Sequence, residues 1–228
     1  MHIPDGFINA GTSVGAAGVA LGTMGVAVRR TRDVLGERQV PLAALTAAFI
    51  FAVQMLNFPV ASGTSGHLLG GVLAAVLVGP WTGAICVAVV LAVQGLLFAD
   101  GGLSALGLNV VNMSLVGAVG GYLVFRAIRR LLPDNLVGTE VAAGVAAFLS
   151  VPMAAAAFTL EFAIGGNADV AWGDVALAMV GTHVLIGIGE GVITAMAVGA
   201  VLASRPDLVH AVDGAAPPLE IRPHEVAR

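Results

Sequence analysis

The 228-residue sequence contains no lysine, and its single cysteine is Cys86. All ten basic residues are arginines. A P-loop nucleotide site needs a lysine that reaches the β- and γ-phosphates, so the chain does not hydrolyse ATP through such a loop. One cysteine can form neither an internal disulfide nor a metal site built from several thiolates.

Charge is scarce as well: only 11% of the residues are charged, whereas 58% are hydrophobic. A water-soluble domain of this size carries about 25% charged residues. The mean hydropathy is +0.96, and apolar runs of the length that a membrane-spanning helix needs recur along most of the chain. These features predict an all-α, polytopic membrane protein.

The apolar runs predict seven transmembrane helices, at residues 7–28, 40–58, 66–79, 81–99, 108–125, 137–160 and 174–203. With seven spans, every arginine falls on one side of the membrane, which is then the cytoplasmic side. The amino terminus is expected outside and the carboxyl terminus inside. Residues 1–203 form one predicted membrane domain, and the proline-containing segment 204–228 is predicted to be a disordered cytoplasmic tail.

The chain begins MHIPDGF, without the basic region and cleavage site of a signal peptide. Met1 is therefore expected to be the mature first residue, with its free amine on the outer face. The amine and the His2 amide nitrogen can close a five-membered chelate ring on a metal ion. The same amide nitrogen and His2 Nδ1 can close a six-membered ring, which gives three nitrogens in one plane.

His67 is the candidate fourth donor, because the predicted topology places the loop 59–67 on the same outer face. Planar coordination by nitrogen suits Ni(II) or Cu(II). The second ring nitrogen of a ligating histidine needs a hydrogen-bond acceptor, for which Thr64, Ser65, Asn109 and Asn112 are candidates. Either histidine alone is more simply explained as an ordinary hydrogen-bonding side chain. Their joint occurrence with an outward terminus favours a metal site.

Two further patterns lie within the predicted spans. His183 and Glu190 are seven residues apart, hence on nearly the same helix face. This intramembrane polar pair is either an element of ion coupling or, as we favour, a buried latch between helices. In the first span, glycines recur at spacings of four and three residues from Gly11 to Gly25. Such a face predicts close packing of this helix against the rest of the protein.

Four motifs together resemble the NikM/CbiM family: MHIPDGF at the start, ASGTSGHLLGG at 61–71, DGGLSALGLNVVNMS at 100–114 and THVLIGIGEGVITA at 182–195. Members of this family are substrate-capture (S) components of energy-coupling-factor (ECF) transporters for nickel and cobalt. The resemblance implies seven helices, an inserted amino-terminal segment, and planar metal binding by Met1, His2 and His67. It also implies that the chain is a transport protein and not an enzyme, in the plasma membrane of a prokaryote.

The resemblance implies partners too: an energising transmembrane subunit, two ATPase subunits, and in some systems a small accessory membrane subunit. The surroundings of the chain are lipid, and no nucleic-acid partner is expected. Ala43 and Ala47, in PLAALTAAF, resemble the small-residue face with which such subunits dock, although ordinary helix packing explains them equally well. The PDG after MHI and the loop GTSGHLLGG, which has no cysteine near His67, are more similar to the nickel-type members of the family, so the resemblance favours Ni(II) over Co(II) as the transported ion.

Two other functions remain open at this point. Gly63-Thr64-Ser65-Gly66 with His183 is similar to the serine–histidine dyad of an intramembrane protease. The predicted depths of the two side chains disfavour it, because Ser65 lies at the outer edge of its span and His183 well inside the last one. Alternatively, an ion-coupled carrier could work alone through His183 and Glu190, and would then take up metal without any partner.

Overall fold

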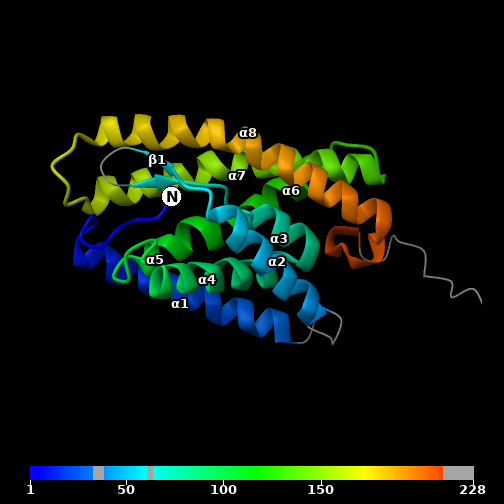
Figure 1. The fold of residues 1–228 in the computed structure, drawn as a ribbon, viewed down its shortest axis with the longest axis horizontal. Coiled ribbons are helices and arrows are strands. Elements are labelled where there is room, and N and C mark those ends of the chain that lie inside the picture. Colours follow the sequence, from blue (N-terminus) through cyan, green and yellow to red (C-terminus); the bar gives the residue numbers. More distant parts are fainter. Residues whose placement is uncertain (33–38, 61–63, 213–228) are drawn as a thin grey trace, which may run out of the picture.

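The computed structural model describes residues 1–32, 39–60 and 64–212. The helices pack as a bundle with their axes roughly along its length (Figure 1). The elements in chain order are α1 (Ala10–Arg32), α2 (Gln39–Gln54), β1 (Phe58–Pro59), β2 (Ser65–Gly66), α3 (Gly71–Val78), α4 (Pro80–Leu97), α5 (Leu106–Asn109), the π-helix η1 (Val110–Gly120), α6 (Gly121–Arg129), α7 (Leu136–Gly165), α8 (Trp172–Ser204) and the short 3₁₀ turns η2 (Pro206–Leu208) and η3 (His210–Val212).

Five of the described helical segments are long and apolar enough to cross a membrane. These are α1, α4, the continuous rod of α5, η1 and α6, and the long helices α7 and α8. Helix α2 is apolar but has only 16 residues. The protein is therefore a multi-pass membrane protein, as its sequence predicts, while seven crossings remain a prediction.

The predicted span 66–79 is the clearest departure from an ordinary membrane helix. Only Gly71–Val78 is helical, and residues Gly71–Leu77 are all buried inside the protein. The chain before it is extended, because β1 and β2 pair antiparallel and Gly70 takes a left-handed conformation with φ of 71°. A Cβ at position 70 would lie 2.7 Å from Ile50 Cγ1, so glycine is required here on both counts. The segment thus carries His67 into the interior instead of leaving it at the surface.

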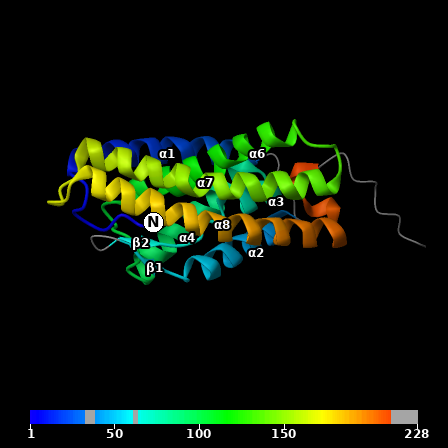
Figure 2. The same ribbon diagram turned by 90° about the horizontal axis from the view of Figure 1, so that it is seen from above.

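Helices α7 and α8 form the longest antiparallel pair (Figure 2). Glycines make their close approach possible, since a Cβ on Gly191 would lie 2.9 Å from Gly144 O and one on Gly187 would lie 2.8 Å from Phe148 O. Helix α7 begins at Asn135, whose side chain accepts the Gly138 N–H at 2.7 Å and caps the helix. This pair forms one wall of the bundle, against which the amino-terminal segment lies.

The predicted inward packing of the α1 glycine face is wrong. Gly15, Gly18, Gly22 and Gly25 are exposed, and a Cβ at any of them would meet nothing within 4 Å. The buried residues of α1 lie on another face, at Ser13, Ala20, Ala27 and Thr31. Small residues mark a helix face that something can approach closely, but they do not show whether that face turns inward or outward.

One end of the bundle carries the described arginines, because α1, α6 and α8 all end there (Figure 1). These arginines are Arg29, Arg30, Arg32, Arg126, Arg129, Arg130 and Arg205.

The predicted disordered tail begins at the same end. Its first residues pack on the bundle instead, since Val209 is fully buried and the His210 ring lies where a Cβ on Gly79 would meet it. Residues 213–228 lie outside the described residues.

Candidate metal site

The amino-terminal segment is inserted into the bundle and held there by its backbone. Met1, His2 and Ile3 are buried (Figure 1 marks the terminus). Asn109 Oδ1 accepts the Ile3 N–H at 2.8 Å, and the Gly102 N–H donates to Ile3 O at 2.8 Å. Farther along, the Asn9 N–H donates to Gly165 O at 2.7 Å. These hydrogen bonds fix the backbone of the amino-terminal segment and hold His2 inside the bundle.

His67 comes to the same place from the other side, on the extended segment before α3. Its side chain is fully buried. His67 Nε2 and His2 Nδ1 lie 3.1 Å apart, and the ring centroids lie 4.6 Å apart. The structure therefore brings His2 Nδ1 next to the His67 ring, and these are the two side chains that the sequence predicts as metal donors.

The other nitrogen of each ring faces an acceptor. His67 Nδ1 lies 2.7 Å from Leu68 O, and His2 Nε2 lies 3.1 Å from Gln94 Oε1. Hydrogens on these two nitrogens leave lone pairs on His67 Nε2 and His2 Nδ1, which point at each other. Two facing lone pairs repel unless a proton or a metal cation lies between them. The arrangement is one that a cation between the two rings would stabilise.

Burial also keeps the donors unprotonated. It lowers the pKa of the Met1 amine to about 4, against the opposing charge of Asp100. Burial lowers the pKa of His2 too, and together with the charges of the terminal amine and of His2 it lowers that of His67 well below its usual range. All three groups are therefore neutral near pH 7, which is the state in which nitrogen binds a metal.

Asp100 places a negative charge next to these donors. Its Oδ1 lies 3.2 Å from His2 Nδ1. Burial raises its pKa, but the contact with His2 and a hydrogen bond from Asn57 outweigh this effect and keep the pKa of Asp100 below its usual value. Within the described residues, no three His, Cys, Asp or Glu side chains form a cluster that could hold a metal ion.

None of the four predicted partners of His67 fills that role, since the acceptor for His67 Nδ1 is the carbonyl of the next residue, Leu68. Asn109 holds the Ile3 backbone. Thr64 Oγ1 contacts Met179 Sδ at 3.6 Å, and Asn112 Nδ2 donates to Glu161 at 2.7 Å. Ser65 lies in β2, two residues before His67. Asn109 thus supports the site through the amino-terminal segment and not through His67.

Two side chains that contact His2, Gln94 and Asp100, are not among the predicted site residues. Gln94 is fully buried near the carboxyl end of α4, and a polar residue within an apolar span is itself a signal of function. Asp100 begins the DGG motif in a loop predicted to lie on the same face as the amino terminus. Both signals are present in the sequence, but neither indicates contact with His2.

His183 and Glu190 both face the segment that carries His67. Glu190 accepts the backbone N–H groups of Leu69 and Gly70, at 2.8 and 2.6 Å. A Cβ on Gly66 would lie 3.4 Å from His183 Cε1. Glu190 therefore holds this loop by two hydrogen bonds, while His183 only lies beside it, and the role of the pair as a latch stays a prediction.

The protease interpretation fails for a reason other than depth. Gly66, the residue after Ser65, lies beside His183, since a Cβ there would be 3.4 Å from His183 Cε1. The predicted difference in depth between Ser65 and His183 is therefore not observed. His183 Nδ1 faces Met179 O at 2.7 Å, however, and its Nε2 has no hydrogen-bond partner among the residues that the structure describes. Ser65 and His183 therefore form no dyad.

Ala43 and Ala47 are half-buried against the bundle. The Cys86 thiol lies 3.4 Å from the carbonyl of Ala43, and Ala47 packs on the main hydrophobic core. The neighbouring pair Ala44 and Ala48 is the exposed one on this helix. Partner docking through Ala43 and Ala47 therefore stays a prediction, and the structure shows them in ordinary helix packing.

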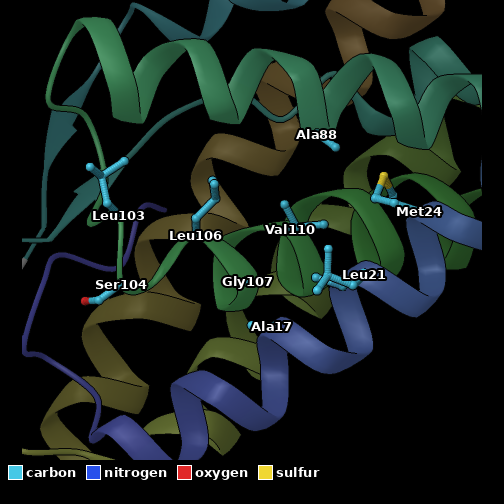
Figure 3. Close-up of a pocket in the computed structure, with 10 residues that line it drawn as sticks. Ala17, Leu21, Met24, Ala88, Leu103, Ser104, Leu106, Gly107 and Val110 are labelled. Carbon is cyan, nitrogen blue, oxygen red and sulfur yellow. The ribbon is translucent and has the colours of Figure 1, made fainter.

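An apolar cavity of about 390 Å³ lies between α1, α4 and residues 103–110 (Figure 3). Figure 3 shows Leu21, Met24, Leu106 and Val110 lining it. Ser104 is the only polar side chain among its lining residues. The lining residues include no histidine or carboxylate, and the cavity is separate from the candidate metal site.

Fold and site together define a multi-pass membrane protein in which two buried imidazoles face each other beside a buried amino terminus. The family model described as the cobalt uptake substrate-specific transmembrane region, CbiM, matches residues 2–208. The chain belongs to this family. Its relatives are named as metal transport proteins and not as enzymes.

Curated relatives and solved structures agree with this assignment. A putative fused nickel transport protein, NikMN, from Archaeoglobus fulgidus is 41% identical over 92% of this chain and 68% of its own length. A cobalt transport protein, CbiM, from Sorangium cellulosum is 34% identical over 92% of this chain and 94% of its own length. The crystal structure of a truncated transition metal transporter superposes with a TM-score of 0.83 at 28% identity, covering 89% of this chain and 99% of that one.

Proposed function

We propose that this protein captures Ni(II), and secondarily Co(II), at the outer face of a prokaryotic plasma membrane. It would do so as the substrate-binding component of an ECF transporter. The observation that carries the proposal is the 3.1 Å approach of His67 Nε2 to His2 Nδ1 beside a buried amino terminus. The metal is the transported substrate in this account.

The proposed ligands are the Met1 amine, the His2 amide nitrogen, His2 Nδ1 and His67 Nε2. In a plane that contains both chelate rings, the fourth ligand lies opposite the amide nitrogen and next to His2 Nδ1. With metal–nitrogen bonds of about 2.0 Å, neighbouring nitrogens of a square lie about 2.8 Å apart. The observed 3.1 Å between His67 Nε2 and His2 Nδ1 is close to that spacing.

Charge balance supports a divalent ion at this position. Buried charge is costly unless it is paired. A deprotonated His2 amide carries one negative charge, and Asp100, in contact with His2, carries another. These two charges match a divalent cation, so the filled site would be neutral as a whole.

Nickel is favoured over cobalt by the donor set. Ni(II) readily adopts a square-planar geometry with nitrogen ligands, and a planar nitrogen site is diagnostic of Ni(II) or Cu(II). The names of the relatives include both nickel and cobalt transport. We therefore propose tighter binding of Ni(II), with Co(II) as a weaker second substrate.

Energy for transport would come from other chains, namely a transmembrane subunit and two ATPase subunits, because this sequence has no P-loop lysine. We place the arginine-bearing end of the bundle in the cytoplasm, with seven passes through the membrane. A solitary ion-coupled carrier is the rival account. It is disfavoured because Glu190 is engaged by two backbone N–H groups.

The test is a Ni(II) titration of the purified full chain in detergent, with a tag only at the carboxyl terminus. Mass spectrometry first establishes that Met1 is the mature first residue. A matched variant carries one glycine inserted before Met1, which moves the amine out of the chelate. We expect one Ni(II) per chain and the absorption of a planar diamagnetic complex, lost in the variant. Equal binding by both forms would exclude the terminal chelate.

A further inference from the structure

Glu190 of α8 contacts the segment that bears His67 through both of its carboxyl oxygens. It is buried, and its two oxygens accept the N–H groups of Leu69 and Gly70, at 2.8 and 2.6 Å. Leu69 and Gly70 follow His67 by two and three residues. The segment has no helical hydrogen bonds of its own at this point, so Glu190 satisfies two backbone donors that would otherwise be unpaired.

Other contacts also hold the segment that bears His67 in place, on the side of α2 and on the side of α8. Gly70 holds a left-handed conformation and packs against Ile50, which turns the chain into α3. Gln54 Nε2 donates to Leu69 O at 2.7 Å from the α2 side. On the α8 side, a Cβ on Gly66 would lie 2.8 Å from Ile186 Cδ1. The His67 segment therefore lies between α2 and α8, fixed by polar contacts on both sides.

His2, by contrast, is held by other elements. Gln94 of α4 contacts its Nε2, and Asp100, just after α4, contacts its Nδ1. Asn109 of α5 holds the next residue, Ile3. The two imidazoles that face each other are thus supported by different helices: His2 by α4 and α5, and His67 by α2 and α8.

We propose that Glu190 is the positioning residue for the fourth metal ligand, which it ties to α8. This inference rests on the proposed function, because it assumes that His67 is a ligand. It follows that the distance between His67 Nε2 and His2 Nδ1 depends on the position of α8 relative to α4. A shift of α8 away from α4 opens the plane and releases the ion, without any change in the ligands themselves.

The experiment compares Glu190→Gln with the wild-type full chain in detergent. Glutamine keeps the shape of the side chain but replaces one acceptor oxygen with an N–H₂ group that faces a backbone N–H. Glu161→Gln is the matched control, since Glu161 is a half-buried glutamate of α7 whose hydrogen bond is to Asn112. The measurements are the affinity for Ni(II), its dissociation rate in excess chelator, the absorption of the saturated complex and the thermal stability of the metal-free protein.

Loss of such a supporting hydrogen bond to a ligand-bearing group typically lowers metal affinity about 10–100-fold. We expect Glu190→Gln to weaken Ni(II) binding by at least about tenfold, through faster dissociation. The absorption of the saturated complex should be unchanged, because the ligands are the same. Glu161→Gln should bind like the wild type. A purely structural role would lower the melting temperature but leave the dissociation rate unchanged, and that result would overturn the proposal.

Hydrogen–deuterium exchange on the wild-type protein tests the same claim without a variant. The amides of Leu69 and Gly70 should be protected in the metal-free protein and exchange more slowly still with Ni(II) bound. Rapid exchange of these amides in both states would contradict the hydrogen bonds to Glu190, and this result would not depend on whether Glu190→Gln folds. If the wild type binds no Ni(II) while these amides are protected, the proposed function fails, and the positioning role fails with it.

Discussion

His2 and His67, 65 residues apart in the chain, present Nδ1 and Nε2 to each other at 3.1 Å inside the bundle. Each ring directs its remaining nitrogen at a fixed acceptor, Gln94 for His2 and the Leu68 carbonyl for His67. The relationship orients both rings before any ion arrives. Pre-orientation of this kind reduces the entropy that must be lost on binding.

His67→Ala should abolish specific Ni(II) binding, because it removes the only proposed ligand outside the first two residues. The loss should exceed the roughly 10–100-fold cost of removing a supporting partner. Isothermal titration of the full chain measures it. The control is His210→Ala, at the arginine-bearing end beside Gly79, which should bind Ni(II) like the wild type. Unimpaired binding by His67→Ala would contradict the assignment of His67.

Binding of Ni(II) near pH 7 should release about one proton per ion. The pKa of the Met1 amine is about 4 because of burial, so at pH 7 the amine has already lost its proton. Both imidazoles are neutral for the same reason. Only the His2 amide still has a proton to lose, so affinity should fall about tenfold for each unit by which the pH drops below 7.

Calorimetry in two buffers of different ionisation enthalpy counts the released protons. An amine with an ordinary pKa would still hold most of its proton at pH 7, and the count would then approach two. A count near zero would mean that the amide nitrogen keeps its proton and is not a ligand.

Asp100→Asn should weaken Ni(II) binding about 10–100-fold. The substitution removes one of the two negative charges that balance the ion, while keeping the size of the side chain. Asp134→Asn is the control, since Asp134 is exposed and pairs with Arg129 at the other end of the bundle. Competition with a chelating indicator gives both affinities. Equal affinities for Asp100→Asn and the wild type would show that the site does not depend on this charge.

Gly102→Ala should reduce Ni(II) binding sharply, because a Cβ there would collide with the backbone of Asp5 and lie 2.7 Å from the carbonyl carbon of Pro4. The inserted amino-terminal segment would have to move, and Met1 and His2 with it. Gly22→Ala on the exposed face of α1 meets nothing within 4 Å and should bind normally. The same titration compares the two, and similar affinities would contradict the tight seating of the segment.

The sequence predicts the chemistry of the site better than its surroundings. Met1, His2 and His67 could be selected because their donor atoms form chelate rings or belong to a rare residue type, both of which are local properties. The acceptor for His67 is a backbone carbonyl, which every residue has and no pattern distinguishes. Asp100 and Gln94 contact His2 only through the fold.

For the helices too, the sequence predicts local features better than contacts with the rest of the fold. Apolar runs locate the long helices well, because burial in lipid or protein selects the same residue types. For the same reason, hydropathy does not show that most of 66–79 is buried inside the protein, or that only the short helix α3 follows an extended stretch there. The α1 glycine face is a second example, since its spacing is visible in the sequence but its exposure is decided by which neighbours the helix meets.

The most direct measurement of the central claim uses Cu(II), which also favours a planar set of nitrogens, as a paramagnetic substitute for Ni(II). Electron paramagnetic resonance is recorded on protein made with ordinary methionine and with ¹⁵N-methionine. Of the proposed donors, the label reaches only the terminal amine of Met1. The account predicts four nitrogen couplings, one of which changes on labelling. A spectrum that labelling leaves unchanged would contradict it.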